Sequence, residues 1–344
     1  MASSDSAYID EEVYSRESTD LDGIAQATAR ERVLGWHSFL DLVWKARVPI
    51  IPPSELDGEG SGRLLGRGAT MVVSEHVWET PQRRAGGGDQ KQPPVVAVKR
   101  LIVRFADSDD GLHARPQHEL ALLANFALEL RALCHGALRG HANVVRLLGI
   151  TWAEKGLPAL VVERASAHCP TIQSLIESRK LRGVQKADIL AGIVDGLAVI
   201  NSLSLVHGDL KPANILIVEQ GTNIVPKLSD FAFSRSWREP LPSGGTEYWN
   251  APEYCEFSTR KYHGSNIPPR CRDLFSLGLV FWYVLNEKLP FEDIGEEADS
   301  SNQTRRKITA AKESGHLLGQ LEADCKRYVG FAHLVEEISL TRLI

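Results

Sequence analysis

The sequence lacks an apolar run long enough to cross a membrane. Its longest run, residues 274–285, has twelve residues and is interrupted by Ser276 and Gly278, whereas a membrane-spanning helix needs about 20 apolar residues. The first residues are polar and acidic, with no basic stretch before an apolar one, so the sequence predicts no secretory signal peptide. We therefore expect an intracellular protein of the cytoplasm or nucleus, without membrane insertion.

Cysteine pairs and basic charge are also scarce. The five cysteines are an odd number, widely spaced and without a C-x-x-C pair, which argues against a disulfide framework and a zinc site. The net charge is −5, and residues 1–22 hold seven acidic residues against one basic residue. The rest of the chain, with 38 basic and 37 acidic residues, lacks the dense positive field that non-specific nucleic-acid binding needs. We therefore expect no nucleic-acid partner.

Apolar residues make up 43% of the chain, enough for a substantial core. The first 22 residues are too acidic and serine-rich to join that core, so we expect them to form a disordered leader. Between residues 24 and 45, five apolar residues recur at helical spacing: Val33, Trp36, Leu40, Val43 and Trp44. We expect an amphipathic helix that packs on the domain behind it, with a helix dedicated to a partner as the alternative.

The region after this helix favours strands, and the later region favours helices. Strands are expected at residues 64–66, 71–78, 95–103, 144–150 and 159–163, with an exposed insertion at 83–94. Helices are expected at residues 118–138, 172–178, 186–202, 274–286 and 305–314. A small strand-rich half before a mainly helical half predicts an α+β fold with two lobes.

The most informative segment runs from His207 to Leu216. Within six residues, Asp209, Lys211 and Asn214 offer a base, a cation and an amide oxygen. This set suits phosphoryl transfer, in which a base receives a hydroxyl proton and a cation neutralises phosphate charge. Sixteen residues later, Asp230 ends a short strand and adds a carboxylate. Hard oxygen ligands of this kind suit Mg²⁺ that bridges nucleotide phosphates.

Over roughly residues 64–290, the sequence resembles the eukaryotic protein kinases. The motifs that carry the resemblance come in kinase order: the glycine-rich loop Gly66–Val73, the strand ending Ala97-Val98-Lys99, Glu129 on helix C, residues 141–149, Val161–Glu163 with gatekeeper Val162, Asp209–Asn214, Asp230-Phe231, Gly245–Glu253 and Asp273–Gly278. The resemblance implies the bilobal kinase fold. We expect residues 1–55 to form the leader and helix, residues 56–163 the N-lobe with helix C, and residues 164–344 the C-lobe.

The resemblance also implies a role for each matching residue. Lys99 would contact the α- and β-phosphates of ATP, held by Glu129, for which Glu119 is the competing candidate. Asp209 would receive the proton of the substrate hydroxyl, with Lys211 on the γ-phosphate. Asn214 and Asp230 would hold Mg²⁺. The remaining nucleotide contacts would come from Leu65, Gly66, Gly68, Val73, Ala97, Leu216 and the backbone near Glu163 and Ala165. An internal apolar stack would contain Leu133, Leu147, His207 and Phe231.

Four departures from the kinase pattern bear on activity. Gly208 replaces the arginine that usually precedes the catalytic aspartate and anchors a phosphorylated activation loop. We therefore expect activity that does not depend on activation-loop phosphorylation. Ala232 replaces a glycine after Asp230-Phe231, which makes large flips of that segment costlier, and Met71 stands where a third loop glycine is common.

The fourth departure concerns the end of the chain. In the family, the glutamate that matches Glu253 pairs with an arginine near the C-terminus, and the expected Arg-Pro segment is not recognisable here. Arg342 is a candidate replacement. We expect a C-terminal end that is either truncated or divergent.

Taken with the resemblance, these residues predict an ATP- and Mg²⁺-dependent protein kinase. Lys211 after Asp209, and Thr246 before the Ala251–Glu253 motif, resemble the serine/threonine branch. The alternative is a pseudokinase that acts as a nucleotide-binding or scaffolding module. The Ala251–Glu253 motif argues against a third class, a kinase of small molecules. The His-Gly-Asp loop and the long connection after helix C resemble divergent kinase-like proteins of filamentous fungi.

Overall fold

The computed structural model describes residues 35–56, 62–68, 70–79, 93–102, 115–152, 156–221, 223–238, 245–258, 269–296, 301–315 and 317. The acidic leader, the first part of the helix expected at 24–45, most of the insertion at 83–94, Ser243 and Arg342 lie outside these residues. Among the described residues, no helix combines the length and apolar character needed to span a membrane.

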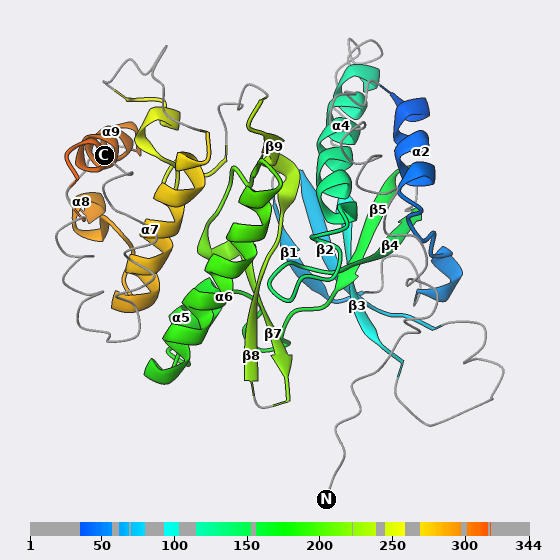
Figure 1. Ribbon diagram of the computed structural model, residues 1–344, viewed down its shortest axis with the longest axis horizontal. Helices are drawn as coiled ribbons and strands as arrows, with labels where there is room; N and C mark the ends of the chain where they lie inside the picture. Colours follow the sequence, from blue (N-terminus) through cyan, green and yellow to red (C-terminus); the bar gives the residue numbers. More distant parts are fainter. Residues whose placement is uncertain are drawn as a thin grey trace, which may run out of the picture.

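The first half of the described chain is built on a five-stranded antiparallel sheet (Figure 1). Its strand order is β1-β2-β3-β5-β4. The strands are β1 (Leu64–Arg67), β2 (Met71–Val77), β3 (Val95–Leu101), β4 (Leu147–Trp152) and β5 (Pro158–Glu163), and helix α4 (Arg115–Cys134) lies beside them. Side chains alternate between the two faces of a strand. Val96 and Val98 of β3 therefore bury one face, whereas Ala97 and Lys99 lie on the other.

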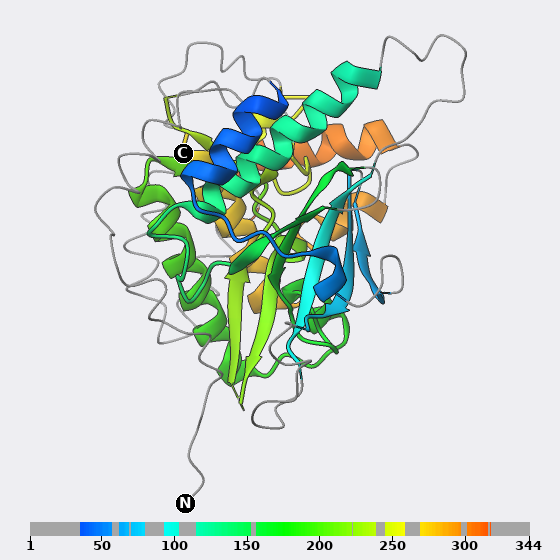
Figure 2. The ribbon, with the colours of Figure 1, turned by 90° about the vertical axis from the view of Figure 1, so that its right-hand side faces the viewer.

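Helix α2 (Trp36–Lys45) lies alongside α4 in both ribbon views (Figures 1 and 2). The buried side of α2 consists of Phe39, Leu42 and Val43. The sequence interpretation of this helix was wrong in part, because Leu40 and Trp44 are 48% and 83% exposed. Of the residues expected on the apolar face, Val43 is buried and Trp36 packs on Phe39 and Trp152, so the helix does pack on the domain, with Phe39 at the centre of the contact.

The strand expected at 144–150 begins later than its apolar residues indicate. Val144 and Val145 turn toward the second half of the molecule, where the Val145 N–H donates to Leu228 O at 2.9 Å. The Asn143 side chain donates to Pro226 O at 3.0 Å. Helix α6 approaches this segment closely at Gly192, where a Cβ would lie 2.5 Å from Asn143 Nδ2. Residues 143–145 thus connect the two halves instead of extending β4.

The second half is mainly helical. Its larger elements are α5 (Ile172–Glu177), α6 (Gly183–Ser202), α7 (Cys271–Asn286), α8 (Glu292–Glu296) and α9 (Ser301–Glu313), with the hairpin β7 (Ile215–Gln220) and β8 (Asn223–Leu228) and the short pair β6 (Leu205–Val206) and β9 (Arg235–Ser236). Thr171 caps α5, since its hydroxyl accepts from the Ser174 N–H at 3.1 Å. Most of α7 is buried, so it forms the centre of this half. The predicted α+β fold with two lobes is confirmed.

Candidate active site

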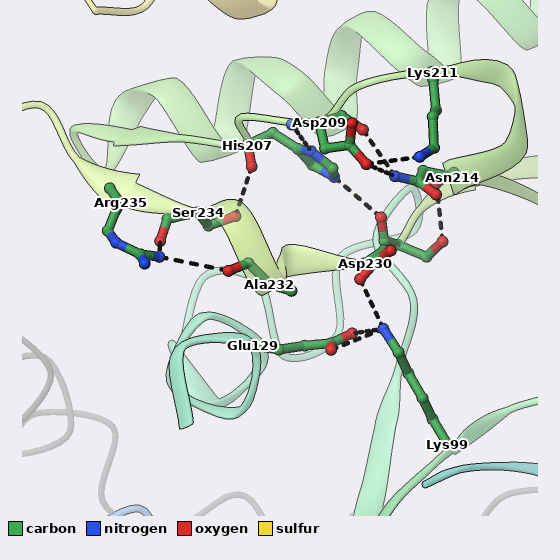
Figure 3. Close-up of polar contacts among 11 residues, drawn as sticks. Lys99, Glu129, His207, Asp209, Lys211, Asn214, Asp230, Ala232, Ser234 and Arg235 are labelled. Carbon is green, nitrogen blue, oxygen red and sulfur yellow. Dashed lines mark hydrogen bonds and ion pairs between the residues drawn. The ribbon is translucent and has the colours of Figure 1, made fainter. Parts of the chain in front are cut away.

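The ammonium group of Lys99 on β3 points into the interior, where it contacts two carboxylates (Figure 3). Its Nζ lies 2.8 Å from both carboxylate oxygens of Glu129 on α4. The same nitrogen lies 2.8 Å from Oδ1 of Asp230, which follows β8. Asp230 has a left-handed backbone with φ 67°, a conformation that aspartate adopts more readily than most residues. Three elements far apart in the sequence therefore meet at one ammonium group.

The protonation states in this cluster depend on one another. Burial alone would lower the pKa of Lys99, but the carboxylates of Glu129 and Asp230 outweigh it and raise that pKa above its usual range. Burial raises the pKa of Glu129 despite the nearby ammonium. Burial also opposes ionisation of Asp230, yet the charge and hydrogen bond of Lys99 lower its pKa below the usual value. Lys99 is thus a fixed cation, and Asp230 is the more readily ionised carboxylate.

A second cluster fixes the carboxylate of Asp209 from three directions. Its Oδ1 accepts a hydrogen bond from the Thr246 N–H at 2.6 Å. Its Oδ2 accepts from Lys211 Nζ at 2.8 Å and from Asn214 Nδ2 at 3.0 Å. Lys211 also donates to the Thr246 hydroxyl at 2.6 Å. Asp209, Lys211 and Asn214 therefore form one hydrogen-bonded unit with Thr246, which lies 35 residues beyond Lys211 (Figure 3 shows the first three).

The loop that carries Asp209 is anchored to α7. The backbone N–H groups of His207 and Gly208 donate to the two carboxylate oxygens of buried Asp273, at 2.6 and 2.9 Å. Gly208 has φ 81°, and a Cβ there would lie 2.7 Å from Phe233 O. Both observations favour glycine at this position. The next residue, Asp209, therefore receives its orientation from a rigidly held backbone.

A model of the protein kinase domain matches residues 89–329. This chain belongs to the protein kinase domain family. Among similar curated proteins is human mitogen-activated protein kinase kinase kinase 7, 36% identical over 242 residues, which covers 68% of this chain and 32% of that protein.

Two further relatives come from a bacterium and a virus. Serine/threonine-protein kinase PkaA of Streptomyces coelicolor is 29% identical over 234 residues, or 66% of this chain and 38% of that protein. A putative serine/threonine-protein kinase/receptor, R826, of Acanthamoeba polyphaga mimivirus is 30% identical over 234 residues, or 67% of this chain and 12% of that protein. The match thus covers well under half of each of these relatives.

Most of the residues expected to contact the nucleotide lie on β1, β2, β3 and β7. Gly66 and Gly68 lie at the turn between β1 and β2, where the Gly68 N–H donates to Met71 O at 2.8 Å. Val73 pairs with Gly66 on one side and with Lys99 on the other. Leu65, Val73 and Leu216 are partly buried and pack against the main core, and Ala97 is buried within it. The loop and these apolar residues thus lie on the strands that lead to Lys99 and on β7.

Two residues expected near the nucleotide lie where β5 ends: Glu163 is its last residue, and Ala165, which is half-buried, follows two residues later. The Glu163 carboxylate accepts from the Arg146 N–H at 2.7 Å and pairs with Lys227 Nζ at 2.8 Å. Its side chain is therefore used to tie β5 to β8, which the sequence did not predict. Val162, expected from the resemblance as the gatekeeper, is buried.

The expected internal stack consists of buried residues. The rings of His207 and Phe231 have centroids 5.0 Å apart. Leu133 of α4 and Leu147 of β4 are buried in the same apolar core. In the Asp230–Ala232 segment, Asp230 has a positive φ and Ala232 does not. The alanine therefore fits here without the backbone strain that a positive φ would cause.

Helix α9 holds the Gly245–Glu253 motif, which the family resemblance matches to the end of the kinase activation segment. The Lys312 side chain is buried, and its Nζ donates to Glu247 O at 2.7 Å and to Asn250 O at 2.8 Å. Arg305 forms ion pairs with Glu247 and Glu256. Burial raises the pKa of Glu253, and the positive charges of Arg272 and, to a smaller extent, Lys312 offset part of that effect. A cation from α9 thus lies near the glutamate whose family partner could not be found in the sequence.

A second buried cation, Arg272, comes from the start of α7. Its Nη2 donates to Asn250 Oδ1 at 3.2 Å, and its guanidinium lies 4.5 Å from the centre of the Tyr254 ring. Sequence reasoning missed both Arg272 and Lys312. The only signal for Arg272 is a charged residue beside Asp273 at the start of an apolar run, and Lys312 has none beyond helical spacing from Ile308.

Proposed function

We propose that this kinase domain transfers the γ-phosphate of ATP to serine or threonine hydroxyls of a protein substrate, with Mg²⁺ bound at Asn214 and Asp230. The observation that supports it most is the Asp209 cluster, in which a carboxylate is held by Lys211, Asn214 and the Thr246 N–H. The kinase relatives support the same activity. The protein that is phosphorylated is not specified by these residues.

Asp209 acts on the acceptor hydroxyl. Its two oxygens are fixed by donors on both sides, so the carboxylate can orient one hydroxyl and receive its proton as the bond to phosphorus forms. Lys211 lies beside it and supplies positive charge for the transferred group. Lys211 also donates to the Thr246 hydroxyl. This bond fixes the positions of Asp209, Lys211 and the segment that begins at Thr246 relative to one another.

The donor set near Asp230 fits a magnesium ion. The Asn214 amide nitrogen donates to Asp209 O and Oδ2, at 2.8 and 3.0 Å, which leaves its oxygen as the atom that can meet a cation. Asp230 supplies a carboxylate whose lowered pKa keeps it ionised. Bound Mg²⁺ would neutralise charge on the ATP phosphates. Lys99 would contact the phosphates, and its ion pair with Glu129 would keep its ammonium group in place.

The Thr246 hydroxyl favours serine or threonine as the acceptor residue, because it bonds to Lys211 in the manner that the serine/threonine branch of the family implies. We expect label from ATP on phosphoserine or phosphothreonine of a general protein substrate such as casein. The Lys99→Met variant should lose at least 90% of this signal, whereas Lys180→Met, at an exposed lysine, should retain it. Equal signal from wild type and Lys99→Met would instead support the pseudokinase alternative.

We also propose that activity does not require phosphorylation of the activation loop. Gly208 offers no guanidinium to a phosphate, and the Thr246 N–H already bonds to Asp209 in the unphosphorylated chain. Phosphatase treatment, or replacement of Ser234, Ser236 and Ser243 by alanine, should leave initial rates within about threefold of wild type. A tenfold loss after phosphatase treatment would contradict this proposal.

A further inference from the structure

We propose that residues 36–56 form a brace that holds α4 in its active position, with Phe39 as the positioning residue. This segment lies outside residues 89–329, the part of the chain that the kinase domain model matches. The inference rests on the proposed function, since it concerns the Lys99–Glu129 pair that the function uses.

Phe39 is the centre of the contact between α2 and α4. Its side chain is fully buried, and its ring meets that of Phe126 edge-on, with centroids 5.8 Å apart. It makes a second edge-on contact with Trp152 at the end of β4, at 6.4 Å. Trp36 packs on both Phe39 and Trp152. The ring of Phe39 thus fills the corner between α4 and the sheet.

The contact is made one helical turn from the ion pair. Phe126 comes three residues before Glu129 on α4, and residues three apart are neighbours on a helix surface. Both side chains are buried. A movement of Phe126 away from the sheet would therefore carry Glu129 away from Lys99 Nζ, from its present 2.8 Å.

The other end of the brace is bonded to the sheet. The Ile51 N–H donates to Ile150 O, and the Ile150 N–H donates to Pro49 O, both at 2.8 Å. Ile51 and Leu56 then join a separate buried cluster with Val96 and Val98, on the opposite face of β3 from Lys99. Trp78 Nε1 donates to Glu55 at 3.0 Å.

The brace therefore connects both partners of the ion pair. One end covers the helix that carries Glu129, and the other covers the back of the strand that carries Lys99 (Figure 2). Packed elements that are tied at two points move together. We infer that a kinase domain without residues 36–56 would keep its catalytic residues but lose their fixed spacing.

Three variants of the full chain test whether the brace positions α4. Phe39→Ala should lower kcat at least tenfold with a smaller change in the KM for ATP. Trp44→Ala, which removes a larger side chain from the exposed side of the same helix, should leave kcat within twofold. If Phe39→Ala does not fold, Phe39→Leu replaces it, with an expected threefold or greater loss at an unchanged melting temperature.

A double-mutant cycle separates positioning from general destabilisation. In a Glu129→Gln background, where the ion pair is already weakened, Phe39→Ala should lower kcat less than twofold. The same tenfold loss in both backgrounds would overturn the inference. Hydrogen exchange gives a readout that does not need turnover: Phe39→Ala should speed exchange in α4 but not in α7. Unchanged exchange in α4 would also overturn it, whereas an inactive wild type would count against the proposed function alone.

Discussion

The buried ammonium of Lys312 offers a direct test of how the activation segment is held. Replacement by methionine keeps a similar side-chain volume but removes the donors to Glu247 O and Asn250 O. Glu247 O would keep its bond from the Asn250 N–H at 3.2 Å, whereas Asn250 O, in the buried interior, would keep only the long contact from Cys255 Sγ at 4.0 Å. The variant therefore removes the hydrogen bonds of Lys312 while most of its packing is kept.

The size of the effect follows from two opposing contributions. A buried acceptor left without a good partner costs about 1–3 kcal/mol, and this applies to Asn250 O, because Glu247 O keeps the Asn250 N–H. Against this, burial disfavours the charged lysine, as its lowered pKa shows, so methionine regains part of that penalty. We expect Lys312→Met to lower the free energy of unfolding by about 1–3 kcal/mol. At roughly 2–4 °C per kcal/mol, the melting temperature should fall by roughly 2–12 °C.

Urea unfolding of wild type and Lys312→Met measures this difference, with Lys288→Met as the control at an exposed lysine after α7. The control should stay within about 0.5 kcal/mol of wild type. The KM for the protein substrate should rise at least threefold in Lys312→Met, because the segment that begins at Thr246 is less firmly held. Equal stability of the two variants would refute this view of α9.

Two further predictions concern titration and thiol reactivity. Because Lys99 lowers the pKa of Asp230, their interaction stabilises the folded state above the usual aspartate pKa and is lost as the pH falls through the lowered value. Lys99→Met should therefore be less stable than wild type near neutral pH, and urea titrations should show the difference shrinking below about pH 4; a constant difference would contradict the assignment. Burial raises the pKa of the Cys134 thiol to about 12, so iodoacetamide at pH 8 should label half-buried Cys271 in the native chain and Cys134 only after denaturation, as mass spectrometry would show.

The motifs of the active site could be predicted from the sequence because each consists of particular residue types at a fixed spacing. Asp209, Lys211 and Asn214 lie within six residues, so local chain geometry alone keeps them together. Lys99, Glu129 and Asp230 come from separate elements, and only the kinase resemblance related them before the structure brought them to one point.

Contacts without a local pattern were missed. On α2, the predicted apolar set includes Val43, which is buried, but also Leu40 and Trp44, which are exposed. The helix packs instead through Phe39, because Phe126 and Trp152 form an apolar corner there. Lys312 resembles any charged helical residue in the sequence. Its burial depends on two backbone carbonyls about 60 residues away, and no spacing rule encodes such a contact.

The role of Asp209 is tested most directly by the rate of phosphate transfer in Asp209→Asn. This variant keeps the side-chain volume and the loop that Asp273 anchors, but it cannot receive the hydroxyl proton. With Mg²⁺ and saturating ATP, we expect kcat to fall at least a hundredfold while the Kd for ATP stays within about threefold of wild type. A variant that transfers phosphate to serine or threonine at the wild-type rate would contradict the proposed mechanism.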